Sequence, residues 1–576
     1  MILTGRVVFA ALACATVAAF FVTQRLKREP SVVQSVRTVK FFSPNGDGVR
    51  DVNEISFQLK RSDDVTVGVV DADGSEVRRL ASDRPARPYR PVRLRWDGDT
   101  GAGVRAPDGL YRLRIGLRRQ GRSVTAPRSL RLDTRPPRPT VVAVRARPDG
   151  SYRVRIRGPG RSVPRFAVYR TDRTRPEVVA RFSGRRGRRA ALWDGRAGAR
   201  PAPPGTYLVA ARVADRAGNV GSAPERLPPR PGEVRGRPGI SIRRLAAQPP
   251  LEPVRAGSPL TFFVNAAGRR YSWTVRRIGE PRPRRRGSAR DPRLALPAPG
   301  RASGLYVLSL RSGRDRSAVP FLVQGRRSSP VQVVVPTITW QGLNQVDDDG
   351  DGLPNTLPAG TRVTLERVFA SGLPADFDDV AALFAWLDDR GLRYDVSSDL
   401  ALARAGAPRA AARTGLLVAG SVRWLPPGLA AGLRAYVRRG GRVASLGTEA
   451  LRRGVSVGPA RLARPTEPGR TDALGSRIGP LLRGPVALTG ARDALGLFEG
   501  TDGAFAGFTA REETLDVGRG RILTSATTAA ARPVLVAYRA GDGIVLRFGV
   551  PGWAQRLRGD AEVATVTRRV WSLLSR

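Results

Sequence analysis

Short runs of alternating hydrophobic and polar residues fill the chain from residue 39 to residue 117. The runs are VKFFSPNGDGVRDVNEISFQL, VTVGVVDADGSEVRRL and LRWDGDTGAGVRAPDGLYRLRIGL, and Gly, Asp and Pro turns bound them. A period of two between such turns predicts antiparallel strands. A further β-rich stretch at 238–325 contains LTFFVNA, YSWTVRRI and GLYVLSL. The pattern therefore predicts an all-β build up to about residue 328.

The first of these β stretches is repeated along the chain. The tripeptide WDG at 96–98 returns at 193–195, and PDGLY at 107–111 returns as PPGTY at 203–207. Repetition at domain length indicates tandem modules rather than a solenoid. We expect the Trp and Tyr of each copy to anchor a small sandwich core, with the Gly residues in turns.

The pattern changes after residue 330. VQVVVP is a near-continuous apolar strand of the buried parallel type, and DFDDVAALFAWLDDRG shows helical spacing that ends at Gly391. Strands and helices then alternate, and the end of the chain predicts a hairpin and a terminal helix. The alternation predicts a doubly wound, flavodoxin-like α/β domain.

The amino-terminal segment Val7–Thr23 carries no charge. A helix of this length spans about 26 Å, and flanking arginines can extend it towards a hydrocarbon core of about 30 Å. We interpret it as an uncleaved signal anchor, with a cleaved signal peptide or a lipoprotein at Cys14 as alternatives. The predicted localisation is a single pass in the cell membrane, with the bulk of the chain extracytoplasmic.

Composition limits the chemistry available to the chain. It has no histidine, and its one cysteine, Cys14, lies in the amino-terminal apolar run. This excludes Ser-His-Asp and Cys-His nucleophilic machinery, His or Cys zinc sites and a disulfide framework. The net charge is +50, which attracts polyanions such as an anionic cell-wall polymer or carbohydrate. An arginine-rich composition bias is the simpler explanation, and no nucleic-acid motif accompanies the charge.

Two acidic loops have the spacing of calcium ligands. QVDDDGDGLPN alternates Asp347, Asp349 and Asp351 before Asn355, so it supplies oxygen ligands around a sharp glycine turn. It resembles the DxDxDG loops of extracellular calcium repeats, although Pro358 stands where an EF-hand has Glu. The alternative is an Asp/Gly-rich surface turn. A weaker version of the pattern lies earlier in the chain, at Asn45, Asp47 and Asp51.

The repeated β stretches resemble the FlgD Ig-like domain, a module of flagellar hook-cap proteins and secreted bacterial proteins. The resemblance rests on SPNGDGVRD at the first entry and on WDG and P-x-G-x-Y in both copies. It implies spacer or adhesion modules rather than catalysis. The second copy lacks the SPNGDG segment, so its boundary is less well defined.

The carboxyl-terminal part resembles the N,N-dimethylformamidase beta-subunit-like C-terminal domain, a relative of class I glutamine amidotransferase folds. VVVPTITWQGLN, FAWLDDRGLRYDV, LLVAGSVRWL and LRAYVRRGGRVASLG carry the resemblance. For the dimethylformamidase itself, the resemblance implies iron held by two tyrosines and a glutamate. Family members typically have TWQAYN and GHDEYW where this chain has TWQGLN and GSVRWL. If the motif tyrosines are the ligands, Leu343 and Trp424 replace both, so iron is not expected.

What remains of the predicted site is a ligand cleft lined by Leu343, Ser421, Trp424 and Glu449. Glu449 follows a strand where α/β domains place site residues, although a helix N-cap explains it more simply. We therefore expect a non-catalytic binding or scaffold protein with a degenerate amidohydrolase-like head. The alternative is an amide hydrolase that uses a metal and carboxylates, and a third interpretation is a purely structural stalk.

The predicted fold class is thus multidomain: an N-terminal membrane helix, all-β Ig-like sandwiches and then a flavodoxin-like (class I glutamine amidotransferase-like) α/β domain. The predicted divisions are a signal anchor at 1–30, Ig-like modules at 31–134 and 135–236, a β-rich domain at 237–328 and an α/β domain at 329–576.

Overall fold

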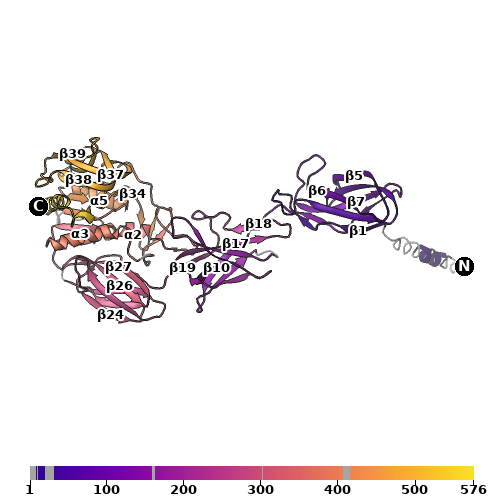
Figure 1. Cartoon of the computed structure of the whole chain (residues 1–576), viewed down its shortest axis with the longest axis horizontal. Coiled ribbons are helices and arrows are strands. Elements are labelled where there is room, and N and C mark those ends of the chain that lie inside the picture. The colour runs from indigo at the N-terminus through magenta and orange to yellow at the C-terminus, as the bar shows by residue number, and fades with distance from the viewer. Residues whose placement is uncertain are drawn as a thin grey trace.

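A computed structural model of the chain describes residues 8–9, 11–19, 32–158, 162–300, 302–370, 372–406 and 415–576. The protein is mostly β, with 44% of its residues in strands and 13% in helices. The β-rich parts follow one another in an elongated molecule that broadens towards the carboxyl terminus (Figure 1).

The first module is a sandwich of two sheets whose strands alternate buried and exposed positions. Residues from both sheets pack around Phe42, Ile55 and Trp96. One sheet has the order β1 (Val33–Arg37), β3 (Asn53–Leu59), β6 (Val92–Trp96). The other has the order β2 (Phe41–Phe42), β9 (Leu130–Leu132), β7 (Gly109–Leu117), β4 (Asp63–Val70), β5 (Glu76–Ala86), with β8 (Arg122–Thr125) also paired to β7.

The second module repeats this plan. One sheet contains β10 (Thr140–Ala146), β11 (Tyr152–Arg157) and β14 (Ala190–Trp193). The other has the order β13 (Glu177–Ser183), β12 (Arg165–Arg170), β17 (Gly205–Ala214), β18 (Val220–Ala223), with β19 (Gly239–Ile242) also paired to β17. A two-stranded ribbon joins β15 (Arg196–Ala197) to β16 (Arg200–Pro201).

The Trp and Tyr predicted to anchor each core are buried in both modules. The indole N–H of Trp96 donates to the carbonyl three residues later at 2.9 Å, and that of Trp193 does the same at 3.0 Å. The hydroxyls of Tyr111 and Tyr207 each donate to the carbonyl of the proline four residues before. The repeated tripeptide and pentapeptide therefore encode one repeated turn geometry.

The third β module shares its core with the carboxyl-terminal part. One of its sheets has the order β20 (Ala246–Gln248), β22 (Pro259–Asn265), β25 (Arg293–Pro297). The other has the order β21 (Val254–Arg255), β27 (Asp315–Gln324), β26 (Gly304–Ser312), β23 (Tyr271–Arg277), β24 (Arg285–Ala289). One apolar cluster joins Phe262 and Val275 of this module to Val333 and Phe384 beyond it. Arg277 also forms an ion pair with Asp388 at 2.7 Å.

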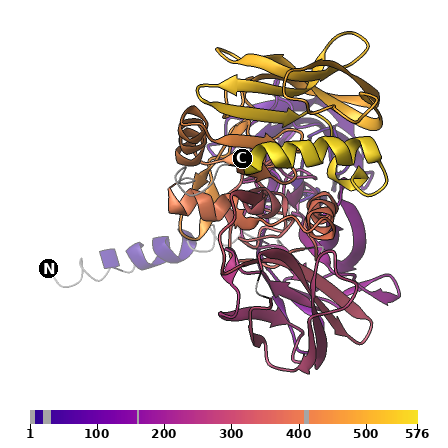
Figure 2. The same ribbon diagram turned by 90° about the vertical axis from the view of Figure 1, so that its left-hand side faces the viewer.

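A nine-stranded sheet dominates the carboxyl-terminal part. Five neighbouring strands are parallel: β30 (Asp395–Ser398), β28 (Val331–Val335), β31 (Gly415–Val418), β33 (Arg442–Ser445) and β41 (Gly543–Phe548). Four antiparallel strands extend it: β40 (Pro533–Ala540), β39 (Arg521–Thr527), β37 (Arg477–Asp493) and β38 (Ala504–Asp516). Figure 2 shows these strands above the terminal helix, with the third module below.

The helices of this part are α2 (Thr337–Leu343), α3 (Phe377–Asp389), α4 (Asp399–Ala405), α5 (Pro427–Arg438) and α6 (Ala561–Ser575), with a 3-10 turn, η2 (Ala554–Arg556). Small strands are β29 (Val363–Thr364), β36 (Arg461–Ala463) and β35 (Ser456–Val457), and the pair β32 (Trp424–Leu425) and β34 (Arg453–Gly454). The predicted flavodoxin-like, glutamine amidotransferase-like fold class is wrong, because long antiparallel strands form much of the sheet and the protein is mostly β.

The predicted membrane helix is also wrong for the residues that the structure describes. None of the helices in that part of the chain is long and apolar enough to cross a bilayer, which takes about 20 helical residues. The signal anchor, the membrane as a partner and the single-pass localisation are corrected accordingly. Of the predicted anchor at 1–30, residues 1–7, 10 and 20–30 lie outside the described residues.

Candidate functional site

Several polar or aromatic residues follow the carboxyl ends of the parallel strands. Asp399 follows β30, Ser421 follows β31 with Trp424 soon after, and Glu449 follows β33. Because these strands are parallel, their ends meet at one edge of the sheet. We call Asp399, Ser421, Trp424 and Glu449 the strand-edge cluster. A methyl group on Gly447 would lie 2.7 Å from the Cα of Ser421, so the chain packs closely there.

Asp399 joins two helices at this edge. Its Oδ1 accepts the backbone N–H of Ile338 at 2.9 Å and of Leu400 at 2.8 Å, so one carboxyl serves the first turns of α2 and α4. Its Oδ2 has no hydrogen-bond partner among the described residues. Burial raises the pKa of Asp399 to about 7 despite these bonds.

Glu449 forms ion pairs with arginines and does not cap a helix. Its carboxylate lies 3.3 Å from a guanidinium nitrogen of Arg423 and 3.6 Å from one of Arg453. Its backbone has a φ of 53°, and its N–H donates to Glu512 at 2.8 Å. A turn follows in place of a helix, so the helix N-cap interpretation is wrong.

Trp424 and Leu343 belong to an apolar cluster. Trp424 is 1% exposed and packs with Ile338, Leu400 and other aliphatic residues, and Leu343 packs against this group. The Arg453 guanidinium lies 5.5 Å from the Trp424 ring centroid. Leu343, Trp424 and Glu449 are therefore brought together, but as packed and ion-paired side chains. Ser421 shares only the strand edge with them.

This arrangement does not fit the iron that the family resemblance implies. Leu343 offers no donor atom, and the indole N–H of Trp424 is a donor without a partner among the described residues. The Glu449 carboxylate already faces two arginines. The three positions do not make a ligand set, and no chemical step through iron follows from them.

A buried ionic network, which sequence reasoning missed, contacts this edge of the sheet through the N–H of Glu449. Arg547 of β41 donates to Glu512 of β38 at 2.6 Å, and Arg452 donates to the other oxygen of Glu512 at 3.0 Å. Glu512 is 0% exposed and Arg547 2%. Because these residues lie far apart in the sequence, no local pattern indicates the network.

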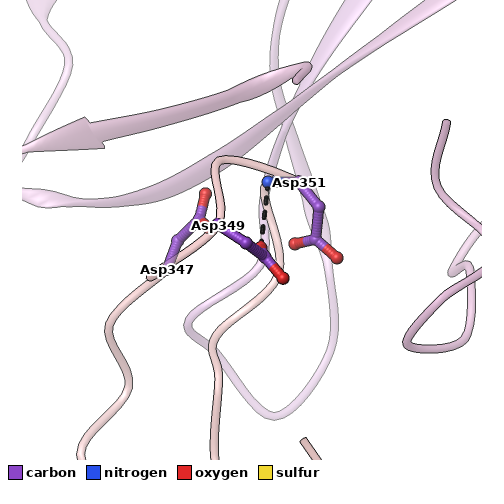
Figure 3. A group of neighbouring side chains, drawn as sticks. All are labelled: Asp347, Asp349 and Asp351. Atoms are coloured by element: carbon purple, nitrogen blue, oxygen red, sulfur yellow. Dashed lines mark hydrogen bonds between the residues drawn. The ribbon is translucent and has the colours of Figure 1, made fainter. Parts of the chain in front are cut away.

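The loop at 347–355, called here the acidic loop, gathers three carboxylates. One oxygen from each of Asp347, Asp349 and Asp351 lies within 4.8 Å of the others. Figure 3 shows the three side chains on the same turn of the chain. Backbone N–H groups of Gly350 and Gly352 donate to Asp347 at 2.7 and 2.9 Å. Burial, together with the neighbouring carboxylates, raises the pKa of Asp347 to about 6 and that of Asp351 to about 7.

The fourth predicted ligand, Asn355, closes the acidic loop. Its Oδ1 accepts the N–H of Asp348 at 2.6 Å, and its Nδ2 lies 3.4 Å from Asp349. Arg367, which sequence reasoning missed, is 6% exposed and donates to Asp348 at 3.0 Å. It also donates to the carbonyl of Asn344, before the loop, and to that of Asn355, at its end. A buried arginine therefore fixes the loop at its base.

The acidic loop packs against the second module. The N–H of Gly239 in β19 donates to the carbonyl of Gly350 at 2.8 Å, and the Thr171 hydroxyl donates to that of Gly352 at 2.6 Å. A methyl group on Gly239 would lie 2.3 Å from an oxygen of Asp347. The loop is thus a joint between the second module and the carboxyl-terminal part.

The weaker loop, Asn45, Asp47 and Asp51, is also a joint. Asp51 accepts the N–H groups of Gly46 and Gly48 at 2.8 and 2.7 Å, so its oxygens hold the loop itself. Asn45 donates to Asn219 of the second module at 3.2 Å. This loop contains two carboxylates only and connects the first module to the second.

Three comparisons relate the chain to known proteins. No curated protein matches it. Solved structures that match include an exo-beta-1,4-mannosidase, Op5Man5, from Opitutaceae bacterium strain TAV5, at 12% identity and a TM-score of 0.26, covering 43% of this chain and 36% of that one. The FN1-FN3 domains of chicken CNTN1 match at 11% identity and a TM-score of 0.18, covering 51% of this chain and 99% of that one.

The BSP domain of a biofilm associated protein matches at 15% identity and a TM-score of 0.12, covering 31% of this chain and 27% of that one. The chain thus spans about a third of the length of the mannosidase and less of the biofilm protein. Residues 289–476 match the family model described as N,N-dimethylformamidase beta subunit-like, C-terminal, and over these residues the chain is similar to that family.

Proposed function

We propose that the protein is a non-catalytic binding or scaffold protein, in which β spacer modules carry a degenerate amidohydrolase-like head. The observation that supports this most directly is the strand-edge cluster. Trp424 is buried there and Glu449 is paired with Arg423 and Arg453. Both side chains are therefore engaged by protein partners at the edge of the sheet where parallel strands usually present their site residues.

The composition supports the same proposal. The chain has no histidine, and Cys14 lies far in sequence from the matched residues 289–476. Acyl transfer through a serine or cysteine needs a general base, which is usually a histidine. The resemblance to FlgD Ig-like modules, which implies spacers, stays a prediction.

An activity screen separates this proposal from the alternative, an amide hydrolase with a metal and carboxylates. The purified full chain is incubated with Fe²⁺ or Zn²⁺ and with N,N-dimethylformamide, formamide and a small peptide amide. We expect no turnover above that of a Glu449→Gln, Asp399→Asn double variant and no stoichiometric iron by elemental analysis. Turnover that a single substitution in the strand-edge cluster abolishes contradicts the scaffold proposal.

We further propose that the acidic loop binds calcium. Three carboxylates within 4.8 Å repel one another, and a divalent cation would relieve both the repulsion and the cost of burial. Because ligands bind as anions, affinity should rise from pH 5.5 to pH 8, through the raised pKa values of Asp347 and Asp351.

A thermal-shift titration tests this. Calcium at tenfold its Kd should stabilise the full chain by about 1.4 kcal/mol. Asp349→Asn should remove the shift, whereas Asp73→Asn, in an exposed turn of the first module, should leave it unchanged. An unchanged melting temperature of the unsubstituted chain in millimolar calcium at pH 8 would exclude the site.

A further inference from the structure

A groove runs along the outer face of the second module, where the first module meets it. Its volume is about 950 Å³. Strands β12 and β17 form the floor, Val49 and Arg50 of the first module form one wall, and Leu227, beyond β18, forms another. The first and second modules lie next to each other in Figure 1, with β17 and β18 labelled in the second. We call this hollow the junction groove.

The junction groove carries uncompensated positive charge. Arg165 and Arg212 stand directly opposite each other on β12 and β17, and Arg181 projects from the same face two positions along. Like charges directly opposite in a sheet are destabilising. These arginines are exposed and, with Arg50, form no ion pair within the described part of the chain. An anion in the groove would remove this repulsion.

The acidic side chain in the groove lining is already engaged. Asp215 accepts the N–H groups of Gly218 and Asn219 through Oδ1, at 2.8 and 3.0 Å, and the Asn219 amide through Oδ2 at 2.9 Å. Asp215 therefore shapes a loop and forms no ion pair among the described residues, and one carboxylate among four arginines leaves the groove positive.

Exposed aliphatic side chains line the same groove. They are 39–50% exposed: Val49, Val163, Val220 and Leu227. Isolated exposed aliphatic residues are ordinary, but four around one hollow indicate a surface that is covered in a complex. A second hollow of about 1180 Å³ shares Val220, Ser222 and Pro224 with the junction groove. The two hollows therefore adjoin, which favours an occupant that continues from one into the other.

We propose that the junction groove binds an extended acidic peptide segment of a partner protein, with aliphatic side chains between its carboxylates. The carboxylates would face Arg165, Arg181 and Arg212, and the aliphatic residues would cover Val163 and Leu227. A glycan would leave that aliphatic surface without complementary contacts. Single-stranded nucleic acid stacks on exposed aromatic platforms, whereas the aromatic rings in the groove lining are buried or half-buried. The net charge of +50 disfavours a second copy of this chain. This proposal does not depend on whether the head is catalytic.

Fluorescence anisotropy with the full chain tests this directly. The probe is a labelled ten-residue peptide of alternating Glu and Val, compared with Lys/Val and Glu/Ser peptides, heparin and a single-stranded DNA oligomer. We expect the Glu/Val peptide to bind most tightly and its affinity to fall with added salt. Equal binding of the Glu/Ser peptide would overturn the proposed occupant. So would tighter binding of heparin or DNA that is weakened by substituting Arg165 and Arg212.

Paired substitutions place the binding on the groove. The double variant Arg165→Gln, Arg212→Gln should weaken Glu/Val peptide binding about tenfold, while its melting temperature stays the same or rises because the like-charge pair is gone. Arg153→Gln, Arg155→Gln removes the same charge from exposed positions of β11 on the other sheet and should change affinity less than twofold. Equal effects of the two variants would show nonspecific charge attraction and refute the groove.

Discussion

Five aspartates in the carboxyl-terminal half keep their protons to a higher pH than an ordinary aspartate, and burial is the main cause in each, including Asp472. Burial raises the pKa of Asp379 and Asp347 to about 6 and of Asp351 and Asp399 to about 7. In the unfolded chain each aspartate releases its proton near the ordinary aspartate pKa of 3.8. The folded chain therefore binds more protons between these values, so its free energy of unfolding falls as pH rises from about 4 to about 7.

Asp399→Asn should reduce this pH dependence. The amide oxygen can still accept the N–H groups of Ile338 and Leu400, but the residue stays neutral at every pH. We expect the loss of stability between pH 5 and pH 8 to shrink, by on the order of 1.4 kcal/mol per unit of pKa shift. Calcium-free calorimetry at both pH values measures it, with Asp378→Asn on the exposed face of α3 as the control. Parallel curves for wild type and Asp399→Asn would contradict the assignment.

At the residue scale, the sequence predicted the features that depend on residues close together in the chain. The buried Trp96 and Trp193 follow from a repeated motif, and the acidic loop follows from its spacing. The pairing of Glu449 with Arg423 could not be predicted, because the two residues follow different parallel strands. Arg453 lies only four residues from Glu449, but no helical pattern there indicated that the two side chains would meet. The same holds for Arg367, whose sequence neighbours give no sign that it is buried.

At the element scale, the parallel strands were predictable and their antiparallel extension was not. β28, β31 and β33 are apolar runs, and the hairpin β40–β41 was predicted as such. Strand β37 carries three Gly and two Pro inside it, in RIGPLLRGPVALTGARD, and β38 carries a Gly in AFAGFTAREETLD. These residues weaken the period-two pattern that identifies a strand. The flavodoxin-like prediction failed for this reason.

The buried ion pair between Glu512 of β38 and Arg547 of β41 should be costly to break. Arg547→Met leaves a fully buried carboxylate short of a partner, at a cost of about 3–5 kcal/mol. Arg511→Met, which breaks the more exposed pair with Glu513, should cost under about 1 kcal/mol. Urea unfolding followed by tryptophan fluorescence compares the two variants, and similar midpoints would mean that the network is not stabilising.

At the scale of the whole molecule, the two acidic loops lie at the two ends of the second module. One contacts Asn219 and the other contacts β19. The sequence predicted both loops but gave no indication that they join modules, because a joint depends on how separate modules pack. Their position explains why glycines stand at Gly239 and Gly352, where another module's atoms approach closely.

Gly239→Ala should loosen the joint between the second module and the carboxyl-terminal part. Its methyl group would displace the Asp347 carboxylate and the backbone of the acidic loop. We expect a larger radius of gyration by small-angle X-ray scattering and faster proteolysis at 345–356, with the modules still folded. Gly428→Ala, where a methyl group meets open space in α5, is the matched control. Unchanged scattering for both variants would show that the joint tolerates the displacement.

The apolar cluster that runs from Phe262 to Phe384 crosses the predicted boundary between residues 328 and 329. A polypeptide beginning at residue 329 would expose to water the apolar surface that the third module covers, and we expect it to aggregate unless residues 246–324 are supplied. The unit that could be exchanged between genes is then the longer segment, in which both apolar surfaces are present. Recombination between β27 and β28 would separate these surfaces and would be selected against.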